Sequence, residues 1–73
     1  MNRAYVITEQ TGRGVIDSSR TITVKSNRKK AIASCEDLLP NGLWEIKDKH
    51  KGKLLGLTGT NTSVTYEMFY VND

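Results

Sequence analysis

Residues 26–42, SNRKKAIASCEDLLPNG, decide the fold because they hold the clearest helical pattern of the sequence. Five apolar residues recur at helical spacing and form one stripe, namely Ala31, Ile32, Cys35, Leu38 and Leu39. Ser26 or Asn27 can cap the first amides of this helix. Residues 40–42, Pro-Asn-Gly, end it, because proline cannot continue a helix and glycine tolerates the turn that follows. We predict a helix over residues 28–39.

On both sides of this helix the sequence predicts β-strands, because apolar and β-branched residues alternate with polar ones. The expected strands are residues 4–8, 21–25, 43–47, 53–58 and 63–71, with turns at 11–14 and 59–62. A further strand begins at residues 15–16 and is interrupted by the polar residues 17–20. The chain is therefore predicted to be a single α+β domain, residues 1–73, with a small antiparallel sheet of four to six strands and one helix packed on one face.

The alternation also predicts which side chains face the core. Ile22 and Val24 are expected to point inward, and Trp44 and Ile46 are expected to share a face. One side of the last strand is expected to carry Val64, Tyr66, Met68 and Tyr70. Phe69 and Val71 remain on the other side as surplus apolar surface, and in so small a chain such a surplus suggests a binding target.

Length and composition limit the protein classes. A chain of 73 residues buries only about 60% of the surface that its unfolded form exposes, so its core is small. The single cysteine, Cys35, excludes an internal disulfide and a multi-cysteine metal site, and it favours a reducing, intracellular compartment. No apolar run reaches ten residues and the N-terminus lacks a signal-peptide core, so we expect neither a membrane span nor export.

Catalytic machinery is missing from the sequence. A nucleophile needs a base within reach, but Cys35 lies on the apolar stripe of the helix while the only histidine, His50, lies in a polar turn between two strands. Among the carboxylates only Glu36 and Asp37 are adjacent, and neighbouring helix positions do not face one site. We expect no enzymatic activity, no cofactor and no metal, and we expect Cys35 to be a buried apolar side chain.

The positive charge of the chain is concentrated in two short segments. Residues 47–53, KDKHKGK, carry a net charge of +3, and residues 25–30 carry +4; since the whole chain carries +3, the remaining residues sum to −4. Such segregation is typical of a surface that attracts an anionic partner. The candidate partner-binding lysines are Lys47, Lys49, Lys51 and Lys53, and the candidate anion or nucleic-acid contacts are Lys25, Arg28, Lys29 and Lys30.

Three interpretations of KDKHKGK remain open at this point. The lysines can keep a hairpin turn soluble, contact nucleic-acid phosphates, or dock on an acidic protein surface. The aromatic residues that could stack on bases lie in the last strand, far from this segment in the sequence. The charges of the helix oppose its dipole, since residues 28–30 place three cations in the first turn, where the dipole is already positive. A helix N-terminus with such cations favours the binding of anions.

The N-terminal strand is apolar on both of its faces. Such a strand either lies in the centre of a sheet or is reserved for a partner. On the second alternative we expect Arg3, Tyr5 and Ile7 to form a docking strand, so that replacing Tyr5 by alanine harms partner binding more than replacing Lys49.

The order of these elements resembles that of the small early transcription regulators of lytic phages, including phages of Xanthomonas, that bind host bacterial RNA polymerase. The resemblance covers residues 21–47: a strand at residues 22–25, a helix containing Ala31-Ile-Ala33, and the segment Leu39-Pro-Asn-Gly-Leu-Trp-Glu-Ile46. It implies a protein that binds the N-terminal region of the β′ subunit near the RNA exit channel. That protein would inhibit initiation by interfering with or displacing the sigma factor, and would promote antitermination.

The same resemblance implies a monomer when free, located in the cytoplasm of the host cell, without a membrane or a small-molecule substrate as partner. Its basic segments would face the acidic enzyme surface or the nascent RNA. Two alternatives stand beside it: a small basic nucleic-acid-binding domain, and a subunit or assembly factor whose extra strand completes the sheet of another protein.

Overall fold

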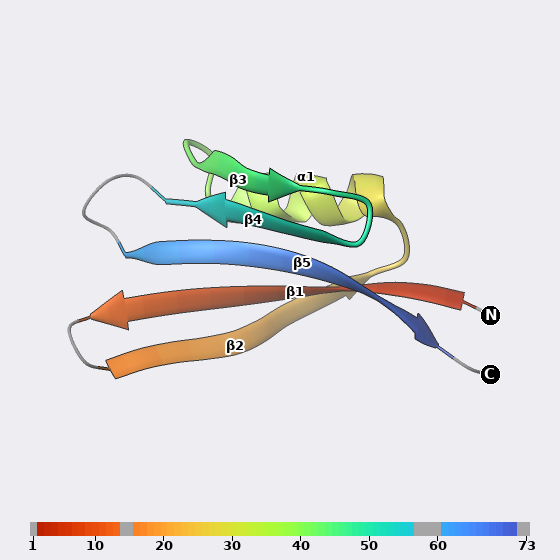
Figure 1. The fold of residues 1–73 in the computed structure, drawn as a ribbon, viewed down its shortest axis with the longest axis horizontal. Coiled ribbons are helices and arrows are strands. Elements are labelled where there is room, and N and C mark those ends of the chain that lie inside the picture. Colours follow the sequence, from red (N-terminus) through yellow and green to blue (C-terminus); the bar gives the residue numbers. More distant parts are fainter. Residues whose placement is uncertain (1, 14–15, 57–60, 72–73) are drawn as a thin grey trace.

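The computed structural model describes residues 2–13, 16–56 and 61–71, which form five strands and one helix. The elements are β1 (Asn2–Arg13), β2 (Ile16–Lys25), α1 (Arg28–Leu38), β3 (Leu43–Lys47), β4 (Lys51–Leu55) and β5 (Thr62–Val71). The strands form one antiparallel sheet in the order β2-β1-β5-β4-β3 (Figure 1). The predicted α+β class and antiparallel sheet are therefore confirmed.

Helix α1 begins and ends almost where its sequence pattern predicts. Asn27 is the N-cap, and its side-chain oxygen accepts a hydrogen bond of 2.9 Å from the backbone N–H of Lys30. At the other end, the N–H of Leu39 still donates to the carbonyl of Cys35, and the N–H of Gly42 donates to the carbonyl of Leu39. The proline and glycine thus end the helix one residue earlier than predicted, at Leu38.

The first two strands are longer than their sequence indicates. Residues 11–13, predicted to be a turn, continue β1, and the polar residues 17–20 continue β2 instead of interrupting it. Polar side chains are tolerated here because β2 is an edge strand, and the cross-strand pair of Glu9 and Arg20 forms an ion pair of 3.5 Å. Residues 59 and 60 of the predicted turn at 59–62 lie outside the described residues, as does the predicted strand end at residues 57–58; β5 begins at Thr62.

Two irregularities in strand register overturn predicted side-chain directions. Between β3 and β4, Trp44 pairs with Leu54 but Ile46 pairs with Lys53, so Trp44 and Ile46 lie on opposite faces rather than on one. Between β1 and β2 the register shifts opposite Ile22. Val24 pairs with Val6 on the face away from the core and is 55% exposed, so the prediction that it points inward was wrong.

The core is one buried cluster to which both the helix and the sheet contribute. Its members are Tyr5, Ile7, Ala31, Cys35, Leu54, Val64 and Tyr66. Tyr66 lies at its centre, with its ring 5.8 Å from that of Trp44 in an edge-on arrangement and 6.2 Å from that of Tyr5. The expected burial of Cys35 and the expected common side of Val64, Tyr66 and Met68 are confirmed.

Candidate binding surfaces

The turn of KDKHKGK is held against the sheet. The hydroxyl of Tyr66 donates to the carbonyl of Asp48 at 2.5 Å, and the backbone N–H of Met68 donates to the carbonyl of His50 at 2.7 Å. Within the turn, the N–H of Asp48 donates to the carbonyl of Lys51. Gly52 pairs with Tyr66 and lets the ring of that tyrosine lie directly over the β4 backbone. Residues 48–50 are therefore fixed in position above β5.

We expect this anchoring to fail when the hydroxyl of Tyr66 is removed. The Tyr66→Phe substitution leaves the carbonyl of Asp48 without its donor in a partly buried place, which costs about 1–3 kcal/mol of unfolding free energy. Urea unfolding followed by the fluorescence of the single tryptophan, Trp44, measures this loss. The matched control is Tyr70→Phe, because Tyr70 is 60% exposed and its change should stay within about 0.5 kcal/mol. Equal stability of both variants would contradict the anchoring role.

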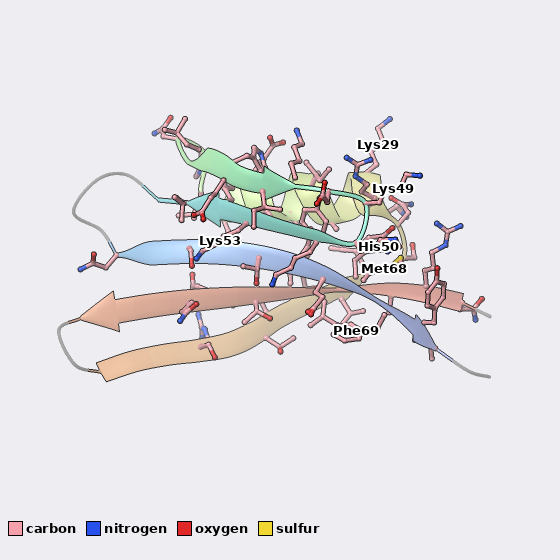
Figure 2. The ribbon with its side chains drawn as sticks, viewed as in Figure 1. Lys29, Lys49, His50, Lys53, Met68 and Phe69 are labelled. Carbon is pink, nitrogen blue, oxygen red and sulfur yellow. The ribbon has the colours of Figure 1, made fainter. Side chains whose placement is uncertain are left out.

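Beside this turn lies an open groove of about 800 Å³, here called the basic groove. Four segments line it: the start of β1, residues 26–29 at the start of α1, the turn between β3 and β4, and Met68 of β5. They contribute four cations, Arg3, Arg28, Lys29 and Lys49, together with His50. Figure 2 shows Lys29, Lys49 and His50 at one end of the molecule, close to Met68. The fold thus brings together cations that are far apart in the sequence.

The electrostatics of the basic groove favour an anionic ligand. Within residues 2–13, 16–56 and 61–71, no carboxylate lines it. Two of the described carboxylates interact elsewhere: Glu9 pairs with Arg20, and Glu36 accepts a hydrogen bond of 3.3 Å from the indole N–H of Trp44. The first turn of α1 contains no acidic residue, so the positive end of the helix dipole adds to the field of the cations.

The remaining predicted cations lie outside the basic groove. Lys47 extends over the ring of Trp44, with Nζ 5.4 Å from the ring centroid, which is a cation–π contact. Lys51 pairs with Glu67 and Lys53 with Thr65 across the β4–β5 ladder, and Figure 2 shows Lys53 well away from Lys49. Lys25 is half-buried on β2, and Lys30 is exposed on α1. Each predicted basic segment is therefore divided between several surfaces.

The predicted docking strand is not available to a partner. β1 lies inside the sheet between β2 and β5, and from Tyr5 to Thr11 it pairs with a strand on each side. Tyr5 and Ile7 are 4% and 0% exposed and belong to the core. Assigning Ile7 to partner contact was wrong, because a strand that is apolar on both faces here is a central strand, whereas Tyr5 still lines the basic groove beside Arg3. Of the three predicted residues only Arg3 is exposed, and it lines the basic groove.

Opposite the core, the sheet carries a second candidate surface. Alternation along β1 and β5 places Ala4, Val6, Phe69 and Val71 on the face away from Tyr5 and Tyr66, and cross-strand pairing adds Val24. Ala4 pairs with Phe69 and Val6 pairs with Val24, and on its other side Val6 pairs with Glu67, so the apolar side chains adjoin one carboxylate. Phe69 is 49% exposed and Val71 44%. We call these five residues the open apolar face; Phe69 and Val71 are the surplus that the sequence predicted.

Sequence reasoning missed Tyr70 as a neighbour of the basic residues. Tyr70 pairs with Arg3 across the β1–β5 ladder and follows Met68 on the same face of β5. Both Arg3 and Met68 line the basic groove, so Tyr70 neighbours two of its lining residues, although it does not line the groove itself. No signal in the sequence indicates this, because the pairing joins residues from the two ends of the chain.

Comparisons with known proteins identify no relative: no protein-family model, no curated protein and no solved structure matches this chain. In the part of the chain that the structure describes, no helix has the length and apolar character needed to cross a membrane. The same residues contain no group of three or more His, Cys, Asp or Glu side chains that could hold a metal ion.

Proposed function

We propose that this protein is a phage-encoded, non-catalytic protein that binds host bacterial RNA polymerase. The observation that carries the proposal is the open apolar face, because a contiguous exposed apolar patch with an aromatic residue typically marks a protein-binding surface. The resemblance of residues 21–47 to phage regulators of transcription gives the class of partner.

In this proposal the two faces of the sheet have different roles. α1 covers the face that carries Tyr5 and Tyr66, and the opposite face is left for the polymerase. Phe69 is the anchor of the interface, since large aromatic side chains near the centre of an interface supply much of its binding energy. The exposed apolar residues Val24 and Val71 belong to the same face and would be covered when the partner docks.

The proposed site on the enzyme is the N-terminal region of β′, close to the sigma-binding region and the RNA exit channel. Binding there would displace or occlude the sigma factor, inhibit initiation at promoters and allow elongating enzyme to read through terminators. Contact with RNA polymerase would place the protein in the host cytoplasm, acting as a monomer that requires neither cofactor nor membrane.

The test is binding of this protein to bacterial RNA polymerase core enzyme and, separately, to an N-terminal fragment of β′. We expect Phe69→Ser to weaken binding at least ten-fold, because a hot-spot side chain is worth about 2 kcal/mol or more. The matched control is Leu38→Ser, which removes a comparably exposed apolar side chain from α1 and should change affinity less than about two-fold. Biolayer interferometry with immobilised protein measures both.

Two results would contradict the proposal. The first is absence of binding to core enzyme at physiological salt. The second is equal binding by Phe69→Ser and wild type, which would remove the open apolar face from the interface. In an in vitro transcription assay, binding without any effect on promoter initiation or on readthrough of a terminator would leave an RNA polymerase ligand but overturn the regulatory role.

A further inference from the structure

We infer that the basic groove and Tyr70 together bind single-stranded nucleic acid, with phosphates held by the groove cations and a base stacked on the tyrosine ring. This inference does not depend on the RNA polymerase proposal, because it concerns the opposite face of the sheet. Alternation along β5 directs Phe69 to one face and Met68 and Tyr70 to the other.

The groove cations have the arrangement that a polyanionic strand requires. Arg3, Lys29 and Lys49 come from three different segments, so the charges line an extended groove instead of forming one point. The turn that carries Lys49 is fixed by the hydrogen bonds from Tyr66 and Met68, which lowers the entropy lost on binding. Cationic grooves of this kind track the backbone of single strands.

Tyr70 supplies a flat aromatic surface beside these cations. Directly opposed residues of an antiparallel ladder have Cβ atoms about 4.5–5.5 Å apart, so the side chains of Arg3 and Tyr70 start from neighbouring positions on the same face of the sheet. Tyr70 is 60% exposed, so its ring is accessible to a ligand. An exposed aromatic side chain next to phosphate-binding cations can stack with an unpaired base.

This combination favours a single strand over the other anionic ligands. In a duplex the bases are stacked on one another and are not presented to a side chain on the outside. An acidic polypeptide would use the cations but would gain little from a tyrosine ring beside the groove. Stacking does not distinguish ribose from deoxyribose, so single-stranded RNA and DNA share the proposed chemistry.

The experiment is fluorescence anisotropy with fluorescein-labelled oligouridylate and oligothymidylate of about ten nucleotides, a length within the usual site size. We expect Lys29→Glu and Lys49→Glu each to weaken binding at least ten-fold, and Lys53→Glu, the same charge change outside the groove, to weaken it less than about three-fold. Tyr70→Ala should weaken binding about five-fold or more, whereas Tyr70→Phe, which keeps the ring, should bind like the wild type.

A salt series adds a readout that a merely structural role would not change. If Lys49 contacts a phosphate, Lys49→Ala should lower the slope of log K against log salt by about 0.7, whereas Tyr70→Ala should leave the slope unchanged. Tryptophan fluorescence and circular dichroism check that each variant is folded.

Several outcomes would overturn the inference. They are absence of binding to both oligonucleotides, equal losses for Lys49→Glu and Lys53→Glu, tighter binding of a matched duplex, or binding of labelled polyglutamate in preference to the oligonucleotides. A preference for one oligonucleotide over the other supports the inference and shows whether the ligand is RNA or DNA. Because Phe69→Ser should bind oligonucleotide normally, failure here and failure of polymerase binding are distinguishable.

Discussion

The Gly52→Ala substitution is expected to destabilise the protein by roughly 3 kcal/mol or more, which is a large part of the total stability of a domain of this size. A Cβ at position 52 would lie under 3.0 Å from three ring atoms of Tyr66. The ring cannot move aside without breaking its hydrogen bond to Asp48 and its contact with Trp44. Urea unfolding followed by tryptophan fluorescence gives the free energy of unfolding.

A double variant shows whether Tyr66 is the cause of this loss. In a Tyr66→Leu background the ring is absent, so Gly52→Ala should cost much less there than in the wild type, a coupling of at least about 1 kcal/mol. Lys51→Ala is the control on the same strand, because Lys51 is exposed and pairs with Glu67 on the other face. Additive effects of the two substitutions, or a loss under 1 kcal/mol for Gly52→Ala alone, would contradict the steric explanation.

Alkaline pH is expected to lower the stability of the folded protein through Cys35. Burial, and to a smaller extent the neighbouring charge of Glu36, raises the pKa of the Cys35 thiol from 9.0 to about 11. In the unfolded chain the thiol loses its proton near its ordinary pKa, so above pH 9 the unfolded state binds fewer protons than the folded state. The stabilising contribution is therefore complete well below pH 9 and is lost as the pH rises through about 11, a total change of about 3 kcal/mol, of which about 2 kcal/mol is lost between pH 9 and pH 11.

The control for this pH dependence is Cys35→Ala, which removes the thiol from the same buried position. Lysine and tyrosine side chains also titrate in this range, but they are present in both proteins, so the difference between the two stability curves isolates Cys35. We expect the variant to lose about 2 kcal/mol less than the wild type between pH 9 and pH 11. Parallel curves would show that the thiol is ionised equally easily in both states.

The helix could be predicted closely because its boundaries depend on local chemistry. The apolar stripe, the Asn27 cap and the proline act over a few residues, and all of them favour the same structure. Side-chain directions in the strands were less predictable, because a register shift reverses the face of every residue beyond it. The prediction for Val24 and Ile46 failed at two such shifts, which strict alternation in the sequence does not reveal.

The candidate surfaces divide in the same way. Alternation along the last strand assigns Phe69 and Val71 to the face opposite the core. This prediction agrees with the open apolar face, to which both residues belong. The basic groove could not be predicted, since Arg3, Arg28 and Lys49 meet through the strand order of the sheet. The docking role expected for Tyr5 and Ile7 has the same cause. A strand that is apolar on both faces is central only if other strands pair with both of its edges, and the sequence does not show which strands do so.

The pairing of β1 with β5 also determines when the chain can fold. β1 joins β5 along nearly its whole length, from Asn2 with Val71 to Thr11 with Thr62, so β1 cannot complete its pairing until β5, which is synthesised later, is available (Figure 1). Until β5 emerges, Tyr5 and Ile7 have no neighbouring Tyr66 and Val64 to cover them. Non-local pairing of this kind slows folding and leaves apolar side chains exposed in the growing chain. We therefore expect the nascent chain to depend on chaperones or on rapid synthesis until β5 is complete.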